Sequence, residues 1–317
     1  MKDLRVAVVG AGAFGRNHMR VVARSEGARL VGVMDADAAR AAEAAAEYEC
    51  GVFGGLEELA GKVDAAIVAV PTVAHAEVGC GLMEAGIDVL VEKPIAASMD
   101  EARRLCETAE RCGRVLQVGH LERFNPAVAA LRELVTIPLF FEIHRLSVFT
   151  PRSLDVDVVL DLMIHDLDIV LSLVKKTPEE IRAAGISILS EKVDIANVRL
   201  QFPGGCIANL TASRVSVEKV RKLRLFQPSE YLSVDYTRQD GAVVRVGEGR
   251  KIQFRPLAVQ KDEPLRLEVE SFFDAVQERK RPMVSGEDAT LALEVAFNIL
   301  VKIEEHARIV TQTISNP

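Results

Sequence analysis

The chain has 317 residues, which corresponds to about two domains of ordinary size. Hydrophobic residues make up 49% of it and charged residues 27%, a balance that excludes long disordered regions. The formal net charge of −7 excludes a general attraction to nucleic acid or to anionic membranes. The longest uncharged apolar stretch, 65–76, is interrupted by Pro71 and is too short to span a bilayer.

The first residues and the cysteines predict a cytoplasmic protein. Lys2, Asp3 and Arg5 stand directly before a short apolar run, which is not the pattern of a secretion signal. The cysteines are odd in number, scattered and without a CxxC pair: Cys50, Cys80, Cys106, Cys112 and Cys206. We therefore expect reduced thiols.

Residues 1–120 alternate between short buried strands and helices. We expect strands at 4–9, 30–34, 64–70, 89–91 and 115–118. The helices between them are expected around 19–22 and at 37–48, 74–85 and 98–112. Asp37 is an expected N-cap, Ser98 and Glu101 form a capping box, and Gly86 ends a helix. This alternation predicts an α/β fold with a doubly wound parallel sheet, a Rossmann domain over residues 1–120.

Residues 121–317 follow a different pattern and predict a second, α+β domain. We expect helices at 126–134, 159–174, 265–279 and 285–306, the last with Ser285 and Asp288 as an N-cap pair, and a long strand at 139–149. The run Thr177-Pro178-Glu179-Glu180 predicts one more helix start. Further strands separated by turn signals predict antiparallel hairpins at 186–189, 193–202, 206–213, 223–226, 231–235, 242–246 and 252–254.

A glycine-rich loop directly after the first strand predicts a dinucleotide-binding site. Its sequence, Gly10-Ala11-Gly12-Ala13-Phe14-Gly15, fits GxGxxG and opens a helix whose free N–H groups can face a pyrophosphate. Asp35 ends the second strand, 20 residues beyond Gly15, where a carboxylate accepts from ribose hydroxyls. This favours NAD over NADP, although Arg40 could reach the same region.

Two further strand ends are expected to line the cofactor crevice. Pro71 and Thr72 end the third strand and are predicted to contact the nicotinamide half, whereas His75 fits either a cofactor contact or a structural histidine. Glu92-Lys93-Pro94 ends the fourth strand. Lys93 could donate a hydrogen bond to a reacting hydroxyl, and Pro94 could fix the backbone there through a cis peptide bond.

Asp161 and His165 lie four residues apart on a predicted helix and so share a face. His165 is a candidate general base, and Asp161 could orient its ring or bind a substrate hydroxyl. A metal site formed by His165, Asp166 and Asp168 is an alternative, but no cluster of His or Cys supplies further ligands, so we expect no metal. A core histidine is the other alternative.

Taken together, these motifs resemble the Gfo/Idh/MocA oxidoreductases over essentially the whole chain. The resemblance implies that Lys93, Asp161 and His165 form the catalytic set, with His165 as the acid/base. It also implies an open, largely antiparallel sheet in the second domain, with homodimer or homotetramer contacts through it. The residues expected to contact NAD are Gly10, Gly12, Ala13, Phe14, Gly15, Asp35, Pro71, Thr72, His75, Glu92, Lys93 and Arg123.

The segments 118–126 and 160–168 look like the UDP-N-acetylglucosamine 3-dehydrogenase branch of that family. The resemblance implies oxidation of a sugar C3 hydroxyl to a ketone. The residues expected at the substrate are Lys93, Arg123, Asn125, Arg152, Asp161 and His165, with His144, Arg145 and Arg152 as candidates for a diphosphate. A surface or strand-face residue is the equal alternative for Arg123, Asn125 and the three diphosphate candidates. A free-polyol dehydrogenase, an imine reductase of the same fold and a non-catalytic NAD-binding sensor remain alternatives.

Overall fold

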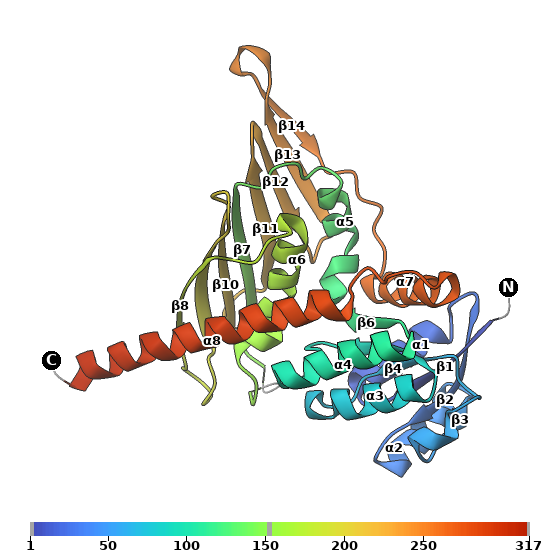
Figure 1. Cartoon of the computed structure of the whole chain (residues 1–317). Coiled ribbons are helices and arrows are strands. Elements are labelled where there is room, and N and C mark those ends of the chain that lie inside the picture. The colour runs from blue at the N-terminus through green and yellow to red at the C-terminus, as the bar shows by residue number, and fades with distance from the viewer. Residues whose placement is uncertain (1–2, 151–153, 316–317) are drawn as a thin grey trace. The chain divides into compact units, whose positions relative to one another are not determined.

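The computed structural model describes residues 3–150 and 154–315 and divides the chain into two compact units (Figure 1). The first unit comprises the residues up to Leu121 together with Glu263–Thr290. The second comprises Glu122–Asp262 and the residues from Leu291 onward. From the sequence pattern, residues 263–290 are expected in the second domain. These residues return to the first unit because Val269, Phe272 and Phe273 are buried in the core that contains Val6 and Met19.

The first unit contains a six-stranded, all-parallel sheet in the order β3-β2-β1-β4-β5-β6, which confirms the doubly wound prediction. The strands are β1 (Leu4–Val9), β2 (Ala28–Met34), β3 (Gly51–Val52), β4 (Ala65–Val68), β5 (Asp88–Glu92) and β6 (Leu116–Gly119). The helices are α1 (Ala13–Val22), α2 (Ala38–Glu47), α3 (His75–Glu84), α4 (Met99–Cys112) and α7 (Pro264–Glu278). Among the described strands of this sheet, the short edge strand β3 is the one that the sequence pattern does not predict.

The predicted helix ends of the first unit are present. The Asp37 carboxylate accepts the N–H groups of Ala39 and Arg40 at 3.0 and 3.1 Å, and the Ser98 hydroxyl accepts that of Glu101 at 3.3 Å. Gly86 follows α3 with a φ of +81°, a conformation that L side chains rarely adopt. The side chains of Asp37 and Ser98 therefore fix where α2 and α4 begin.

The second unit contains an eight-stranded sheet in the order β14-β13-β12-β11-β7-β10-β9-β8. Its neighbouring strands are antiparallel except for β7 and β10, so the prediction of a largely antiparallel sheet is confirmed. The strands are β7 (Phe140–Val148), β8 (Glu180–Ile186), β9 (Ile195–Gln201), β10 (Ile207–Ser216), β11 (Val220–Gln227), β12 (Glu230–Asp235), β13 (Asp240–Val246) and β14 (Ile252–Pro256).

The helices of the second unit are α5 (Pro126–Arg132) and α6 (Ile164–Val174), and a π-helical turn, Val159–Met163, precedes α6. The helix α8 (Gly286–Ser315) begins in the first unit and continues in the second. At its start, Ser285 and Asp288 exchange backbone-to-side-chain hydrogen bonds of 3.2 and 3.3 Å, as the spacing predicted. No helix in the described part of the chain is long and apolar enough to cross a membrane.

The helix predicted to start at 177–180 is wrong. The backbone there enters β8: Glu179 donates its N–H to Gln201 at 2.8 Å, and Glu180 pairs with Gln201. Pairing with β9 outweighs the local capping pattern, as tertiary context often does. The strand expected at 186–189 consequently lies earlier, and the residues after it turn around the buried carboxylate of Asp194.

Candidate active site

The three glycines of the phosphate loop have the three different surroundings that a dinucleotide site requires. Gly10 has a φ of +102°, and a Cβ on it would lie 2.4 Å from the Ala69 carbonyl oxygen. A Cβ on Gly15 would lie 1.8 Å from the carbonyl oxygen of Gly10. A Cβ on Gly12 would meet nothing within 4 Å. The protein therefore packs against the first and third glycines and leaves the middle one open to a ligand.

The N-terminus of α1 is uncapped. Gly12 provides no side-chain hydrogen bond, and the first turn, which begins with Ala13, carries no acidic residue. Its N–H groups and the helix dipole therefore favour an anion such as a pyrophosphate. Phe14, in the same turn, is 65% exposed. The loop fits a dinucleotide, and these residues could hold it.

Asp35 braces the phosphate loop from the end of β2. One of its carboxylate oxygens accepts the Ala11 N–H at 2.7 Å, and the other accepts the Asp37 N–H at 2.8 Å. The guanidinium of Arg40 lies 3.5 Å from Asp35 and 3.4 Å from Asp37. The Asp35 carboxylate, which is predicted to bind the ribose, thus also stabilises the phosphate loop, and the Arg40 guanidinium lies beside it.

His75 joins the two loops that follow β4 and β5. Its ring is buried, with Nδ1 2.9 Å from the Pro94 carbonyl oxygen and Nε2 3.0 Å from that of Val70. Burial lowers the pKa of this imidazole. The ring nitrogens are thus used by the protein, which matches the structural alternative, and the expected cofactor contact stays a prediction. The preceding residues, Pro71 and Thr72, remain at least partly exposed.

Lys93 follows the last residue of β5. The Lys93–Pro94 peptide bond is cis, as the sequence suggested, and Lys93 is half-buried. The preceding carboxylate, Glu92, accepts the Lys93 N–H at 3.2 Å and lies 2.7 Å from Nε2 of His18. The predicted cofactor contact of Glu92 stays a prediction, while its carboxylate holds the start of this loop.

Asp161 and His165 lie on either side of a change in helix type. Asp161 belongs to the π-helical turn and His165 to the first turn of α6, and both are half-buried. The sequence had predicted one continuous α-helix here. Single π turns occur often at functional sites, because the wider turn re-aims side chains. The π-helical turn thus indicates a functional segment here, independently of the residue types.

A buried network of charges that the sequence pattern does not predict supports α6. Arg145 on β7 is 1% exposed and binds Asp166 through two hydrogen bonds of 2.6 and 2.9 Å. It also donates to Glu122 at 2.9 Å and lies over the ring of Tyr236. Because both acceptors are protein carboxylates, Arg145 matches the alternative of a strand-face residue, and its diphosphate contact stays a prediction. One sequence pattern could have indicated that Arg145 is buried: it falls on the same face of the alternating strand β7 as the buried apolar residues.

The charges of this network balance within the protein. Arg145 stands directly opposite Arg221 on β11, and Glu122 lies 3.6 Å from Arg221. Burial would raise the pKa of Glu122, but Arg145 lowers it overall. Burial would lower the pKa of Arg145, but the charge of Asp166 and its hydrogen bonds raise it overall. Burial raises the pKa of Tyr236 well above its ordinary range. Two guanidinium groups thus oppose two carboxylates beside the turn that carries His165.

The polar groups of two expected substrate residues are engaged inside the second unit. Arg123 forms a bidentate ion pair with Asp168, with both distances 2.7 Å. Asn125 caps α5 through Ala127 and donates to the Tyr236 carbonyl oxygen at 3.0 Å. Their predicted ligand contacts stay predictions. His144 is 39% exposed beside Glu142, and Arg152 lies outside the described residues.

The same ion pairs bear on the alternative metal site. Both oxygens of Asp166 and of Asp168 are bound by arginine side chains. A cation at His165 would have to displace a guanidinium to use either carboxylate. The arrangement therefore favours the acid/base interpretation of His165 over a ligand role.

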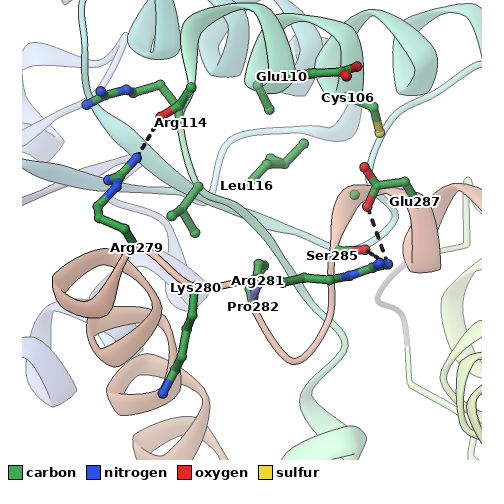
Figure 2. A pocket seen from close by; sticks show the side chains of 14 residues that line it. Cys106, Glu110, Arg114, Leu116, Arg279, Lys280, Arg281, Pro282, Ser285 and Glu287 are labelled. Atoms are coloured by element: carbon green, nitrogen blue, oxygen red, sulfur yellow. Dashed lines mark hydrogen bonds and ion pairs between the residues drawn. The ribbon is translucent and has the colours of Figure 1, made fainter.

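A separate pocket of the first unit contains none of the predicted site residues. It has a volume of about 480 Å³ and is lined by α4, β6 and the connection from α7 to α8 (Figure 2). Its arginines are bound by the protein: Arg114 donates to the Gly86 carbonyl oxygen, Arg279 to Asp88 and Arg281 to Ser285. Each of these arginines thus already has a hydrogen-bond acceptor in the protein.

Comparison with known proteins connects these observations. A model of an oxidoreductase family with an NAD-binding Rossmann fold, GFO/IDH/MocA, matches residues 4–120, and a model of the GFO/IDH/MocA C-terminal domain matches residues 140–226. The chain belongs to the GFO/IDH/MocA oxidoreductase family. It is therefore an enzyme of the dehydrogenase type with an NAD-binding domain.

Individual family members are similar over most or part of the chain. The UDP-N-acetylglucosamine 3-dehydrogenase of Acidithiobacillus ferrooxidans is 35% identical over 310 residues, which cover 96% of this chain and 98% of that protein. Two solved structures of that enzyme give TM-scores of 0.91 and 0.92, covering 96% of this chain and 99% of theirs. An inositol 2-dehydrogenase of Corynebacterium glutamicum is 34% identical over 181 residues, 53% of each chain.

Proposed function

We propose that this protein oxidises the C3 hydroxyl of a UDP-N-acetylhexosamine, such as UDP-N-acetylglucosamine, to a ketone with NAD. The observation that carries this proposal is the 35% identity over 96% of the chain with a UDP-N-acetylglucosamine 3-dehydrogenase. An inositol 2-dehydrogenase reaches similar identity over only 53% of the chain. The likeness to the nucleotide-sugar enzyme thus includes the second unit, which carries Asp161 and His165.

In this proposal, Lys93, Asp161 and His165 act on one substrate hydroxyl. His165 accepts the hydroxyl proton, a role that an imidazole can perform near neutral pH. Lys93 donates a hydrogen bond to the same oxygen and stabilises the negative charge that develops there. Asp161 orients the imidazole or binds a neighbouring hydroxyl. Bound NAD supplies the acceptor for the hydride that leaves the carbon.

The remaining residues would position the two ligands. The loop from Gly10 to Gly15 and the start of α1 would bind the pyrophosphate, and Asp35 the adenosine ribose. We propose NAD rather than NADP, because the Asp35 carboxylate repels a 2′-phosphate. Arg123 and Asn125 would contact the ligands only by exchanging part of their present hydrogen bonds.

A homodimer or homotetramer formed through the sheet of the second unit belongs to the same proposal. Exposed apolar side chains support it on the edge strand β14, where Ile252 is 75% and Phe254 71% exposed. Light scattering of the purified protein measures the state directly, and a monomer at all concentrations would contradict it. A cytoplasmic location is also proposed, and the five free cysteines support it.

The experiment that tests the function is a substrate screen. UDP-sugars, inositol and free monosaccharides are each mixed with enzyme and NAD, NADH is followed by absorbance, and the product is identified by mass spectrometry. We expect NADH and a 3-keto sugar from UDP-N-acetylglucosamine or a close relative. Turnover of inositol or monosaccharides alone would establish the polyol alternative. NAD binding without turnover of any of them would establish the sensor alternative.

A further inference from the structure

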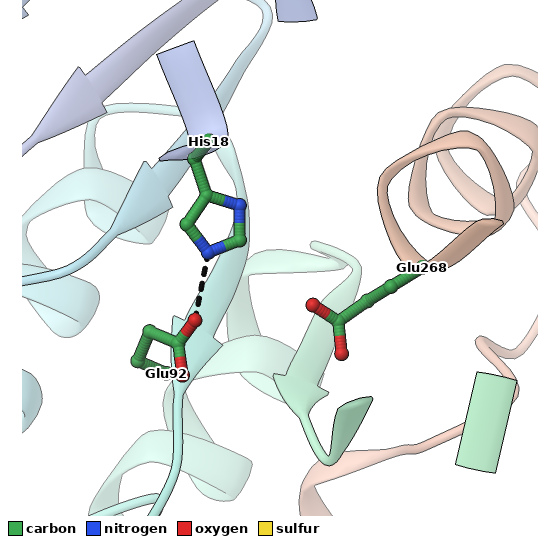
Figure 3. Close-up of side chains that lie close together, drawn as sticks. All are labelled: His18, Glu92 and Glu268. Atoms are coloured by element: carbon green, nitrogen blue, oxygen red, sulfur yellow. Dashed lines mark hydrogen bonds and ion pairs between the residues drawn. The ribbon is translucent and has the colours of Figure 1, made fainter. Parts of the chain in front are cut away.

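Three side chains of the first unit, two of them fully buried, lie close together (Figure 3). His18 comes from α1, Glu92 from the end of β5 and Glu268 from α7. His18 and Glu268 are 0% exposed, and the Glu92 side chain is 15% exposed. One ligand atom from each residue lies within 4.8 Å of the other two. Figure 3 shows the Glu268 carboxyl group directed toward the His18–Glu92 pair.

The hydrogen bonds around this cluster leave one carboxyl group unsatisfied. His18 Nε2 lies 2.7 Å from Glu92 Oε1, and Glu92 Oε2 accepts the Lys93 N–H. Among the described residues, neither oxygen of Glu268 and not Nδ1 of His18 has a hydrogen-bond partner. A fully buried polar group without a partner is costly, so something in the cluster must satisfy Glu268.

The charges indicate which carboxyl group carries a proton. Two carboxylates this close in a buried site cannot both ionise cheaply. Burial alone would raise the pKa of Glu92, but His18 and Lys93 lower it overall. Burial, followed by the charge of Glu92, raises the pKa of Glu268 well above its ordinary value. Glu92 is therefore the ionised member and Glu268 the neutral one.

A metal ion shared by the three residues fits the distances less well. Two ligands of one tetrahedral zinc lie about 3.3 Å apart, because each is about 2.0–2.2 Å from the metal. His18 and Glu92 are in direct contact at 2.7 Å, the distance of a hydrogen bond. A proton accounts for this contact without any movement of the side chains.

We propose that Glu268 is a protonated carboxylic acid in the native protein and donates its O–H, directly or through one water molecule, into the His18–Glu92 pair. This hydrogen bond would give Glu268 the partner that it lacks. Where the two polar atoms lie more than about 3.5 Å apart, a single water molecule can bridge them. The Glu92 carboxylate is then held by a neutral group from α7 and a histidine from α1.

A consequence follows for Lys93, and it rests on the proposed function. The Glu92 carboxylate holds the Lys93 backbone, so a carboxylate fixed from two sides fixes the start of that loop. Glu268 and His18 are then positioning residues for the lysine that is proposed to bind the reacting hydroxyl. They act through Glu92 and do not touch the substrate themselves.

The pH dependence of stability tests the protonation without any substrate. Native protein would retain the Glu268 proton that the unfolded chain loses above its ordinary pKa, so wild-type stability falls as pH rises. The unfolding equilibrium constant of wild type, relative to that of Glu268→Gln, should rise about tenfold per pH unit from pH 5 upward. The ratio becomes constant above the native pKa of Glu268. A ratio that stays constant from pH 5 to 8 would overturn the proposal.

Other ionisable groups lie near Glu268, so matched variants are needed. Glu92 faces Glu268, His18 and Lys93 act on Glu92, and Glu92 acts on His75. Because wild type and Glu268→Gln share these groups, they largely cancel in the ratio. Glu270→Gln makes the same exchange on the same helix, where Glu270 is 37% exposed beside Arg266, and should show no such slope.

Two further measurements keep the outcome decisive if Glu268→Gln does not fold. Isotope-edited infrared spectroscopy of the wild type should show a protonated glutamic acid at pH 7, and its absence would contradict the proposal. Elemental analysis of purified protein should find no stoichiometric zinc, manganese or iron. If the wild type contains one equivalent of such a metal and Glu268→Gln does not, a bound cation occupies the cluster and the proposal of a protonated Glu268 is wrong.

The effect on catalysis separates this inference from the proposed function. Glu268→Met removes the donor at similar volume, and we expect it to lower kcat about tenfold with an unchanged NAD Kd. Glu268→Gln keeps a neutral donor and should restore most of that loss. If no substrate is turned over, the stability ratio and the infrared band still decide the protonation. If those hold while kcat is equal in both variants, the positioning role is wrong.

Discussion

The two units use polar groups in opposite ways at the places where ligands are expected. In the first unit, the phosphate loop exposes backbone N–H groups, and Gly12 has open space beside it. In the second unit, the charges around α6 are buried and bound to one another, as in the pair of Arg145 with Asp166. A backbone site needs absent side chains, whereas a buried charge network needs every partner present. The two regions should therefore respond differently to substitution.

The largest effect is expected from breaking the buried network. Arg145→Met leaves Glu122 and Asp166 without their shared partner and should lower the free energy of unfolding by about 3–5 kcal/mol. Denaturant unfolding of both proteins measures it. Arg224→Met is the control, because the Arg224–Glu142 pair is 43% and 36% exposed and contributes below about 1 kcal/mol. Equal effects of the two substitutions would contradict the assigned role of the network.

The phosphate loop should separate folding from binding. Helical Gly→Ala normally stabilises by about 1 kcal/mol, but Gly15→Ala should destabilise, because its Cβ meets the Gly10 carbonyl group. Gly12→Ala should leave stability within about 0.5 kcal/mol, since its Cβ meets nothing in the protein. It should nevertheless weaken NAD binding about tenfold, near 1.4 kcal/mol, by crowding the pyrophosphate. Thermal melts and calorimetric titration would reveal any reversal of these two patterns.

Acid should remove a smaller part of the second unit's stability. Burial would raise the pKa of Asp194, but the N–H groups of Ile188, Leu189 and Ser190 lower it to about 2, from 3.8. The ionised form stabilises fully above pH 3.8, and this contribution is lost as pH falls toward 2. Asp194→Asn should cost about 1–2 kcal/mol at pH 7 and progressively less below pH 4. A pH-independent difference would show that the carboxylate charge is not responsible.

The smallest effect concerns the choice of coenzyme. Arg40 lies 3.5 Å from Asp35 and is 47% exposed, so it can offset part of the carboxylate charge. Arg40→Ala should raise the ratio of kcat/KM for NAD over NADP severalfold, about 0.6–1 kcal/mol. Initial rates with both coenzymes measure the ratio. A preference for NADP in the wild type would overturn the proposed choice of NAD.

The sequence predicts the first unit better than the second for a physical reason. Short apolar runs and polar caps are local signals, and most elements up to β6 lie where those signals place them. The return of α7 is not local: its apolar face shows that the helix is buried, but not in which core. At 177–180 the local sequence has a helix-capping pattern, but the chain forms a strand there because it pairs with β9.

The site shows the same division. The spacing of Gly10, Gly15 and Asp35 specifies a loop whose geometry the structure bears out. The partners of Arg145 and of Glu268 could not be predicted, because they come from residues far apart in sequence. A charged residue on the buried face of a strand indicates that it has a partner of opposite charge, but the sequence does not show which residue that partner is.

The proposed catalytic set is tested most directly by turnover of two alanine variants on the substrate that the screen identifies. Lys93→Ala and His165→Ala should each lower kcat at least about a hundredfold, the lower range for acid–base groups, with the NAD Kd unchanged. Ser172→Ala, also on α6, is the control and should keep its turnover. Wild-type turnover in either Lys93→Ala or His165→Ala would contradict the role assigned to that residue.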